Sequence, residues 1–255
     1  METKTGIIGG GRITRIFLQA LKNNHESLNL FTICDVNNDV TEKLKSRFHE
    51  IIISNLETAA AQDIVIIALH PPVIMETLEK IKNHILNNTI IVSFAPKITI
   101  AKIADKLGGI KKIIRMIPNA PSIIGMGYNP LCFSEVFSAT EKREFIKFFS
   151  PMGESPEVEE STLEAYAITA AMGPTYLWFQ LYKLMELSLD FGLDEKETST
   201  AVKKMVNGSL ETMFSHYTKE DVLDLIPVKP IGEYEEDILS GYDIKLRGLY
   251  EKLTS

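Results

Sequence analysis

The chain has 255 residues, of which 45% are hydrophobic, and its formal net charge is -7. This length suffices for one large domain or two ordinary ones, with enough apolar side chains to fill a core without disulfides. The acidic balance and thinly spread basic residues argue against nucleic acid and anionic membranes as partners. We therefore expect a small-molecule partner.

The cysteines, Cys34 and Cys132, match no metal-binding or redox spacing, so we expect neither a metal site nor a disulfide framework. No apolar run reaches the roughly 20 residues that span a bilayer. The first expected strand begins almost at the N-terminus, which leaves no room for a signal peptide. We therefore expect a cytoplasmic protein.

In the first half of the chain, short apolar runs alternate with longer amphipathic stretches. Short β-branched runs separated by helical patterns predict parallel strands buried on both faces, hence a doubly wound α/β sheet of the Rossmann type. We expect strands near 6–8, 31–34, 51–53, 64–69, 89–94 and 113–116, and helices near 13–21, 40–48 and 73–86.

A glycine-rich segment follows the first expected strand and opens the first expected helix. Gly9 can form the tight turn, and Gly11 lets a pyrophosphate approach the backbone at the helix N-terminus. Thr14 replaces the third glycine of the dinucleotide-binding pattern and adds bulk between helix and strand. The segment predicts a phosphate loop, with a glycine-rich turn that binds no ligand as the alternative.

Asp35 ends the second expected strand, where a carboxylate can accept hydrogen bonds from the adenosine ribose and repel a 2′-phosphate. No arginine follows in Val36, Asn37 and Asn38 to bind such a phosphate, although Lys43 could reach it. Asp35 therefore favours NAD(H) over NADP(H), unless it is only a helix-capping or turn residue.

His70, followed by two prolines, closes the expected strand 64–69 at the carboxyl edge of the sheet, where ligands bind in open α/β folds. Imidazoles can donate protons near neutral pH, which makes His70 a candidate proton donor. A turn histidine at the surface is the alternative. We interpret the remaining histidines as surface residues: His25, His49, His84 and His216.

The segment 118–127 is rich in proline, glycine and asparagine and predicts a loop. Ser138 and Glu141 have capping-box spacing ahead of an expected helix over 140–149. The chain then changes character near residues 155–161.

Ser161 and Glu164 repeat the capping-box spacing, and from there helical periodicity predominates without a convincing strand. We therefore expect a Rossmann domain over residues 1–157. An all-helical domain for substrate binding and dimerisation would occupy residues 158–255.

The expected helix over 175–191 is apolar nearly all round. A helix of that kind is buried on most sides, either as a core helix or in a subunit interface. We expect a homodimer or larger homo-oligomer, with Trp178 and Leu181 in its interface. The narrow polar stripe of the helix consists of Gln180, Lys183, Glu186 and Asp190.

Five segments follow one another in register: Gly6–Gly11, Asn55–Glu57 with Asp63–Ala68, Arg115–Pro121, Glu157–Glu160 and Gly173–Tyr176. Together they resemble the Δ1-pyrroline-5-carboxylate reductase family, and the Arg-x-x-Pro-Asn-x-Pro and Gly-Pro-x-Tyr runs are the more specific. The resemblance implies NAD(P)H-dependent reduction of a cyclic imine carboxylate to proline. It also implies dimers built by interlocking C-terminal helices.

Carried over position by position, the resemblance implies a cofactor site and a nearby substrate site. Glu160 would lie near substrate and nicotinamide and joins His70 as a candidate catalytic residue. Asn119, in the Arg-x-x-Pro-Asn-x-Pro run, is a candidate substrate contact. The implied cofactor residues are Ile8, Gly9, Gly10, Gly11, Arg12, Ile13, Asp35, Asn37, Asn55, Ala68, Leu69, His70, Pro71, Phe94, Ala95 and Pro96.

The chain departs from the family pattern most in the substrate half. The family's Ser-Pro-Gly-Gly-Thr-Thr loop, which binds the substrate carboxylate through amides and a hydroxyl, is replaced by residues 226–232 with two prolines. Lys229 is a candidate replacement ligand for the carboxylate, or else a solvated surface residue. The family's lysine-proline becomes His70-Pro71, and its Ala-Ala-Gly becomes Ala95-Pro96-Lys97.

The leading hypothesis is a reductase that passes hydride from nicotinamide to a C=N bond of a small carboxylated substrate. A β-hydroxyacid-type dehydrogenase is the second hypothesis. Its helix lysine a few residues beyond a glycine has no counterpart between Gly173 and Lys183. The third hypothesis is a non-catalytic NAD(H)-binding regulatory protein.

Overall fold

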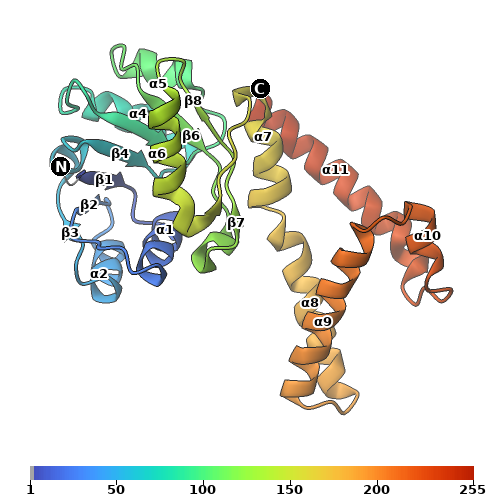
Figure 1. Ribbon diagram of the computed structural model, residues 1–255. Helices are drawn as coiled ribbons and strands as arrows, with labels where there is room; N and C mark the ends of the chain where they lie inside the picture. The colour runs from blue at the N-terminus through green and yellow to red at the C-terminus, as the bar shows by residue number, and fades with distance from the viewer. Residues whose placement is uncertain (1–2) are drawn as a thin grey trace. The chain divides into compact units, whose positions relative to one another are not determined.

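The computed structural model describes residues 3–255, which form two compact units (Figure 1). Unit 1 comprises the residues up to Met172 together with Tyr250–Ser255, and unit 2 comprises Gly173–Leu249. The sequence predicts a domain boundary between residues 157 and 158. The two compact units do not show which parts of the chain fold separately, so this boundary stays a prediction.

Unit 1 is built on a seven-stranded sheet in the order β3-β2-β1-β4-β5-β6-β8. The first six strands are parallel, and β8 runs antiparallel to β6. This order of parallel strands is that of the doubly wound Rossmann fold and confirms the predicted fold class. The strands are β1 (Thr5–Ile8), β2 (Phe31–Cys34), β3 (Ile52–Ile53), β4 (Ile64–Ile67), β5 (Ile90–Ser93), β6 (Ile113–Met116) and β8 (Leu131–Phe133).

Helices cover both faces of this sheet, because apolar side chains leave the strands in both directions. One core cluster joins α1, α2 and α6 to the sheet around Phe17 and Phe149. The other joins α3, α4 and α5 around Ala59 and Leu78. These helices are α1 (Arg12–Asn23), α2 (Asn38–Arg47), α3 (Leu56–Ala60), α4 (Pro71–Ile81), α5 (Ile100–Lys106) and α6 (Ala139–Phe149).

The two predicted capping boxes have different outcomes. The first is confirmed, because the Ser138 side chain accepts from the Glu141 amide while the Glu141 carboxylate accepts from the Ser138 amide. The second is wrong: no side-chain cap precedes the helix near Ser161, and Glu164 forms an ion pair with Arg115 instead. That segment consists of a 3-10 turn η3 (Glu160–Thr162), α7 (Leu163–Tyr166) and a π-turn η4 (Ala167–Ala171).

The predicted loop over 118–127 contains a 3-10 turn and leads into a two-stranded sheet of β7 and β9. The sequence pattern predicts neither these two strands nor β8. Strands of two or three residues are too short to show a hydrophobic period. The elements are η1 (Ala120–Ile124), β7 (Gly127–Tyr128), η2 (Ser150–Met152) and β9 (Gly153–Glu154).

Unit 2 is helical throughout, and α8 and α9 lie side by side in Figure 1. Its few buried side chains include Thr198 and Val202 of α9, whereas α8 has none. No helix within residues 3–255 is long and apolar enough to cross a membrane. The elements are α8 (Pro174–Asp190), α9 (Glu195–Met213), α10 (Lys219–Asp224), η5 (Gly232–Tyr234) and α11 (Glu235–Thr254), whose last residues belong to unit 1.

Candidate functional site

The candidate site lies at the carboxyl edge of the parallel strands. In doubly wound folds, ligands bind there at the point where the strand order reverses, here between β1 and β4. The Gly9 amide donates to the Cys34 carbonyl at 2.8 Å, and the Ala68 amide donates to the Ile8 carbonyl at 2.8 Å. These bonds fix the segments that leave the strands. The predicted cofactor segments that follow β1, β2, β4 and β5 at this edge are 9–13, 35–37, 68–71 and 94–96.

Gly9 and Gly11 serve different purposes in the glycine loop. Gly9 has a φ of 103°, and a Cβ atom there would lie 2.4 Å from the Ala68 carbonyl oxygen, so only glycine fits. Gly11 has an ordinary φ of -69°, and a Cβ atom there would meet nothing within 4 Å. The backbone at Gly11 is therefore open to an approaching group.

The N-terminus of α1 has the properties of an anion site. The first bond that closes the helix runs from the Arg15 amide to the Gly11 carbonyl at 3.2 Å. The amides that precede it in a helix have no intrahelical acceptor, and they favour phosphate groups. Thr14, at the third-glycine position, is fully buried and donates its hydroxyl to the Gly9 carbonyl, which satisfies the extra polar atom.

Asp35 closes the turn after β2. Its two carboxylate oxygens accept from the Gly10 amide at 2.7 Å and from the Asn37 amide at 2.8 Å. Asn37 in turn caps α2 by accepting from the Asp39 amide at 3.0 Å. Asp35 therefore has the turn role that the sequence left open. Since each carboxylate oxygen has further acceptor capacity, this role is compatible with a ribose contact.

Asn55 and His70 both occupy helix N-cap positions. The Asn55 side chain accepts from the Thr58 amide at 2.9 Å and so caps α3. His70 precedes Pro71 at the start of α4, is exposed and makes no side-chain capping bond. The imidazole of His70 therefore lies at the carboxyl edge without a bond to the backbone amides of α4.

Glu160 belongs to a buried charge network around Arg115 of β6. The Arg115 side chain is 1% exposed and lies 2.9 Å from Glu160 Oε1 and 2.7 Å from Glu164 Oε1. The same two oxygens accept from the Ile100 amide at 2.7 Å and from the Lys97 amide at 2.9 Å. The network therefore ties η3 and α7 to the loop that follows β5, next to the predicted cofactor segment 94–96.

The two predicted substrate contacts lie in different units. Asn119 is buried, and its amide nitrogen donates to the carbonyls of Tyr128 at 3.3 Å and Ala170 at 3.4 Å. Lys229 is an exposed residue of unit 2, between α10 and η5. The roles of both residues toward substrate stay predictions.

Lys97 and Glu164 lie next to the site, which the sequence did not predict. One signal was available, because Arg115 interrupts an apolar run in a strand predicted to be buried on both faces. A buried guanidinium needs carboxylate partners. The sequence does not say which carboxylates these are.

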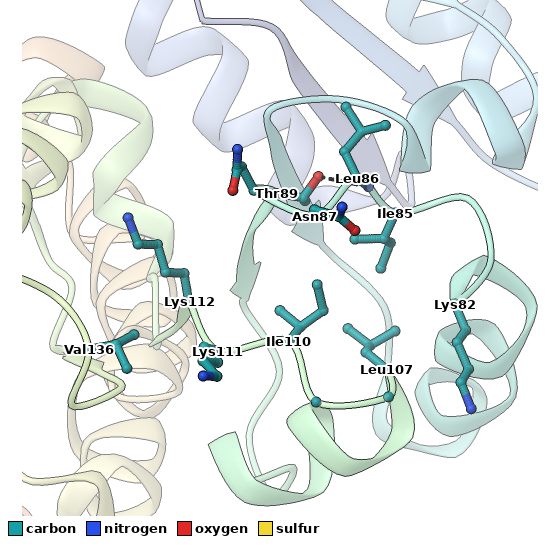
Figure 2. A pocket seen from close by; sticks show the side chains of 13 residues that line it. Lys82, Ile85, Leu86, Asn87, Thr89, Leu107, Ile110, Lys111, Lys112 and Val136 are labelled. Carbon is teal, nitrogen blue, oxygen red and sulfur yellow. Dashed lines mark hydrogen bonds between the residues drawn. The ribbon is translucent and has the colours of Figure 1, made fainter.

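A cavity of about 580 Å³ lies at the opposite, amino edge of the sheet, before β5 and β6 (Figure 2). Its lining includes Ile85, Leu107 and Ile110, with Lys82 and Lys112 around them. Dinucleotides bind doubly wound sheets at the carboxyl edge. This cavity is therefore separate from the candidate site.

The fold and the glycine loop define a Rossmann protein of the dinucleotide-binding architecture. Residues 4–97 match the family model described as "NADP oxidoreductase coenzyme F420-dependent". The chain is similar to the pyrroline-5-carboxylate reductase of Corynebacterium melassecola, with 24% identity over 86% of this chain and 82% of the relative. It is also similar to that of Escherichia coli strain K12, with 22% identity over 82% and 78% of the two chains.

Solved structures agree with this similarity. Pyrroline carboxylate reductase of Plasmodium falciparum with NADP bound matches with a TM-score of 0.77 at 20% identity, over 99% of this chain and 95% of that one. The reductase of Streptococcus pyogenes matches with a TM-score of 0.80 at 18% identity, over 98% of both chains. The fold is thus that of these reductases, and the resemblance seen in the sequence is confirmed at low identity.

Proposed function

We propose that this protein is an NAD(P)H-dependent reductase of the Δ1-pyrroline-5-carboxylate reductase type, acting on the C=N bond of a small cyclic imine carboxylate. The open backbone at Gly11, at the N-terminus of α1 and the carboxyl edge of the sheet, is the observation that carries this proposal. The similarity to reductases of that name over more than three quarters of the chain supports it.

The residues at the carboxyl edge fit a dinucleotide. The amides of Gly11, Arg12 and Ile13 at the start of α1 would hold the pyrophosphate, and Asp35 would accept from the ribose hydroxyls. A reduced nicotinamide would supply the hydride. The segments 68–71 and 94–96 would line the cofactor from the ends of β4 and β5.

The contribution of the protein to the chemistry is orientation and charge. A protonated imine needs little further acid help, so no dedicated proton donor is required. Glu160 directs Oε1 to Arg115 and the Ile100 amide, which leaves Oε2 for a substrate contact. His70 is the second group that could exchange a proton at this edge.

We expect NADH to bind more tightly than NADPH. The Asp35 carboxylate sits beside the Gly10 amide, so a 2′-phosphate there would be close to a negative charge. The difference should shrink in Asp35→Ser, with Asp39→Ser as a control outside this contact. Titration calorimetry with both cofactors checks this, and equal or reversed dissociation constants in the unaltered protein would contradict it.

We expect weak or absent turnover of pyrroline-5-carboxylate. Lysine can pair with a carboxylate, but it orients the group less strictly than a set of backbone amides. A displacement of about 1 Å can reduce the rate on the order of 100-fold. Residual turnover should fall further in Lys229→Ala, with Lys219→Ala, at an exposed position at the start of α10, as the control.

Steady-state assays with NADH and a panel of pyrroline-5-carboxylate, other cyclic imines and keto acids test this expectation and the proposed function together. Turnover near the usual enzyme median of about 10 per second, unaffected by Lys229→Ala, would show that other groups hold the substrate. Turnover with keto acids and with no cyclic imine would favour a hydroxyacid-type dehydrogenase instead.

We expect a homodimer whose interface includes α8. Trp178 is 46% exposed, and a groove of about 340 Å³ between α8 and α9 is lined by Leu181, Tyr182 and Val202 among others. Because α8 has no buried residue in one chain, the interface reading of this apolar helix is favoured over the core-helix reading. A second copy of the chain would cover this surface.

Leu181→Glu should give monomer or aggregate, because an unpaired charge is costly to bury in an interface. Glu211→Lys is the control, because it changes the charge at an exposed position of α9 that does not line the groove. Light scattering that shows the unaltered protein as a monomer at micromolar concentration would rule the interface out.

We propose the reducing cytoplasm as the compartment of this protein. Cys34 and Cys132 are both buried and unbonded. Burial raises the pKa of the Cys132 thiol to about 12, so this thiol is protonated and unreactive at neutral pH.

A further inference from the structure

Lys97 adopts a backbone conformation that lysine rarely takes. Its φ is 74°, in the left-handed region that favours glycine. Among the described residues only His25 shares this feature without being a glycine. A strained residue of this kind persists where the surrounding structure holds it in place.

Two contacts hold Lys97, one at each end of the residue. Its backbone amide donates to Glu164 Oε1 at 2.9 Å, within the Arg115 network. Its Nζ donates to the Lys252 carbonyl at 2.9 Å, although 155 positions separate the two residues. The last carbonyls of a helix lack intrahelical donors and attract cations, which suits an ammonium group at the end of α11.

The end of α11, which belongs to unit 1, also packs against other residues of that unit. Leu253 contacts the apolar cluster that contains Ile117, Leu163 and Ala167. The C-terminal residues 250–255 are therefore held by two contacts. The Lys97–Lys252 hydrogen bond joins them to the loop after β5, and Leu253 packs on the apolar cluster.

Lys97 follows directly on the segment 94–96 that would line the cofactor. Phe94 is bonded to the end of β4 through its amide, which donates to the Ile67 carbonyl at 3.0 Å. Pro96 has a fixed φ, so the backbone between Lys97 and the cofactor segment has fewer torsion angles that could absorb a movement of Lys97. Glycine would fit the backbone angle at position 97 but could not reach Lys252.

We propose that Lys97 is a positioning residue that fastens the end of α11 to the cofactor-lining segment 94–96, so that the C-terminal residues support the cofactor site. This inference rests on the proposed function. The lysine side chain is retained at a glycine-type angle because its contact with α11 keeps the loop in its binding geometry.

Lys97→Gly tests the proposal, because it relieves the backbone strain and removes only the side-chain contact. We expect a melting temperature equal to or above that of the unaltered protein. The dissociation constant for NADH should rise by up to roughly fivefold, the limit reached when the whole free energy of the lost hydrogen bond had favoured the binding geometry of the loop. Backbone amides of residues 250–254 should exchange hydrogen faster. Lys97→Arg should restore the NADH affinity and the slow hydrogen exchange, and Lys111→Gly, at an exposed position before β6, should change neither of these two.

A merely structural role of Lys97 would lower stability and affinity together. An NADH dissociation constant in Lys97→Gly equal to that of the unaltered protein overturns the inference and leaves the proposed function intact. Unchanged hydrogen exchange at residues 250–254 also overturns it, because the contact would then hold nothing in place. Failure of the unaltered protein to bind NADH overturns the proposed function and this inference with it.

Discussion

Replacing Gly11 by aspartate is expected to stabilise the protein slightly and to weaken NADH binding at least about 100-fold. Gly11 is the N-cap residue of α1, and a Cβ atom there meets nothing within 4 Å. Aspartate is a better N-cap than glycine by a few tenths of a kcal/mol, roughly. The same carboxylate would stand where the pyrophosphate approaches. Like charges about 4 Å apart near a protein surface repel by roughly 4 kcal/mol, so the affinity should fall at least about 100-fold.

Gly11→Asn is the matched control for this substitution. Asparagine caps a helix as well as aspartate does and has nearly the same size, but it carries no charge. We expect an intermediate loss of affinity, which separates the effect of bulk from that of charge. For each variant, calorimetric titration gives the dissociation constant for NADH, and a urea denaturation curve gives the free energy of unfolding. A Gly11→Asp protein that binds NADH like the unaltered one would show that no phosphate lies at this helix N-terminus.

Replacing Arg115 by methionine is expected to destabilise unit 1 by about 3–5 kcal/mol, the usual cost of breaking a buried ion pair. The guanidinium lies between Glu160 and Glu164, and Glu164 is itself largely buried. Without Arg115 these carboxylates face each other with only backbone amides as partners. The free energy of unfolding, measured in urea, checks this expectation.

Two further variants define the cause of that loss. Arg115→Met combined with Glu164→Gln should recover part of the stability, because one of the unpaired charges is removed with little change of shape. Arg143→Met, at an exposed site on α6, should change stability by no more than about 0.5 kcal/mol. A loss below about 1 kcal/mol in Arg115→Met would mean that water or other groups compensate the carboxylates.

The parallel sheet could be predicted because its strands are short runs of β-branched residues buried on both faces. The limits appear where the outcome depends on distant residues. Ser138–Glu141 and Ser161–Glu164 have the same spacing, yet only the first forms a capping box. The difference lies in Arg115, which is close to Glu164 in space and 49 positions away in sequence.

In the candidate site too, features set by local sequence could be predicted, and features set by distant residues could not. The glycine loop and Asp35 could be found from the sequence, because local backbone geometry determines their place at the ends of β1 and β2. Of the two bonds that Asp35 accepts in its turn, the one from the Asn37 amide is local, whereas the one from the Gly10 amide, 25 positions away, depends on the fold. The positive φ of Lys97 has one sequence signal, because the resembled family has glycine at this position. The bond from its side chain to the end of α11 has none, since the two residues are 155 positions apart.

The proposed function requires that this protein moves hydride from NADH to the carbon of a C=N bond. Incubation with NADH deuterated at C4 and a panel of cyclic imine carboxylates and keto acids, followed by mass spectrometry, tests it most directly. We predict that at least one imine yields a cyclic amine with a single deuterium on the former imine carbon, and that the keto acids yield none. A labelled hydroxy acid in place of the amine, or NADH binding without any labelled product, would contradict the proposed function.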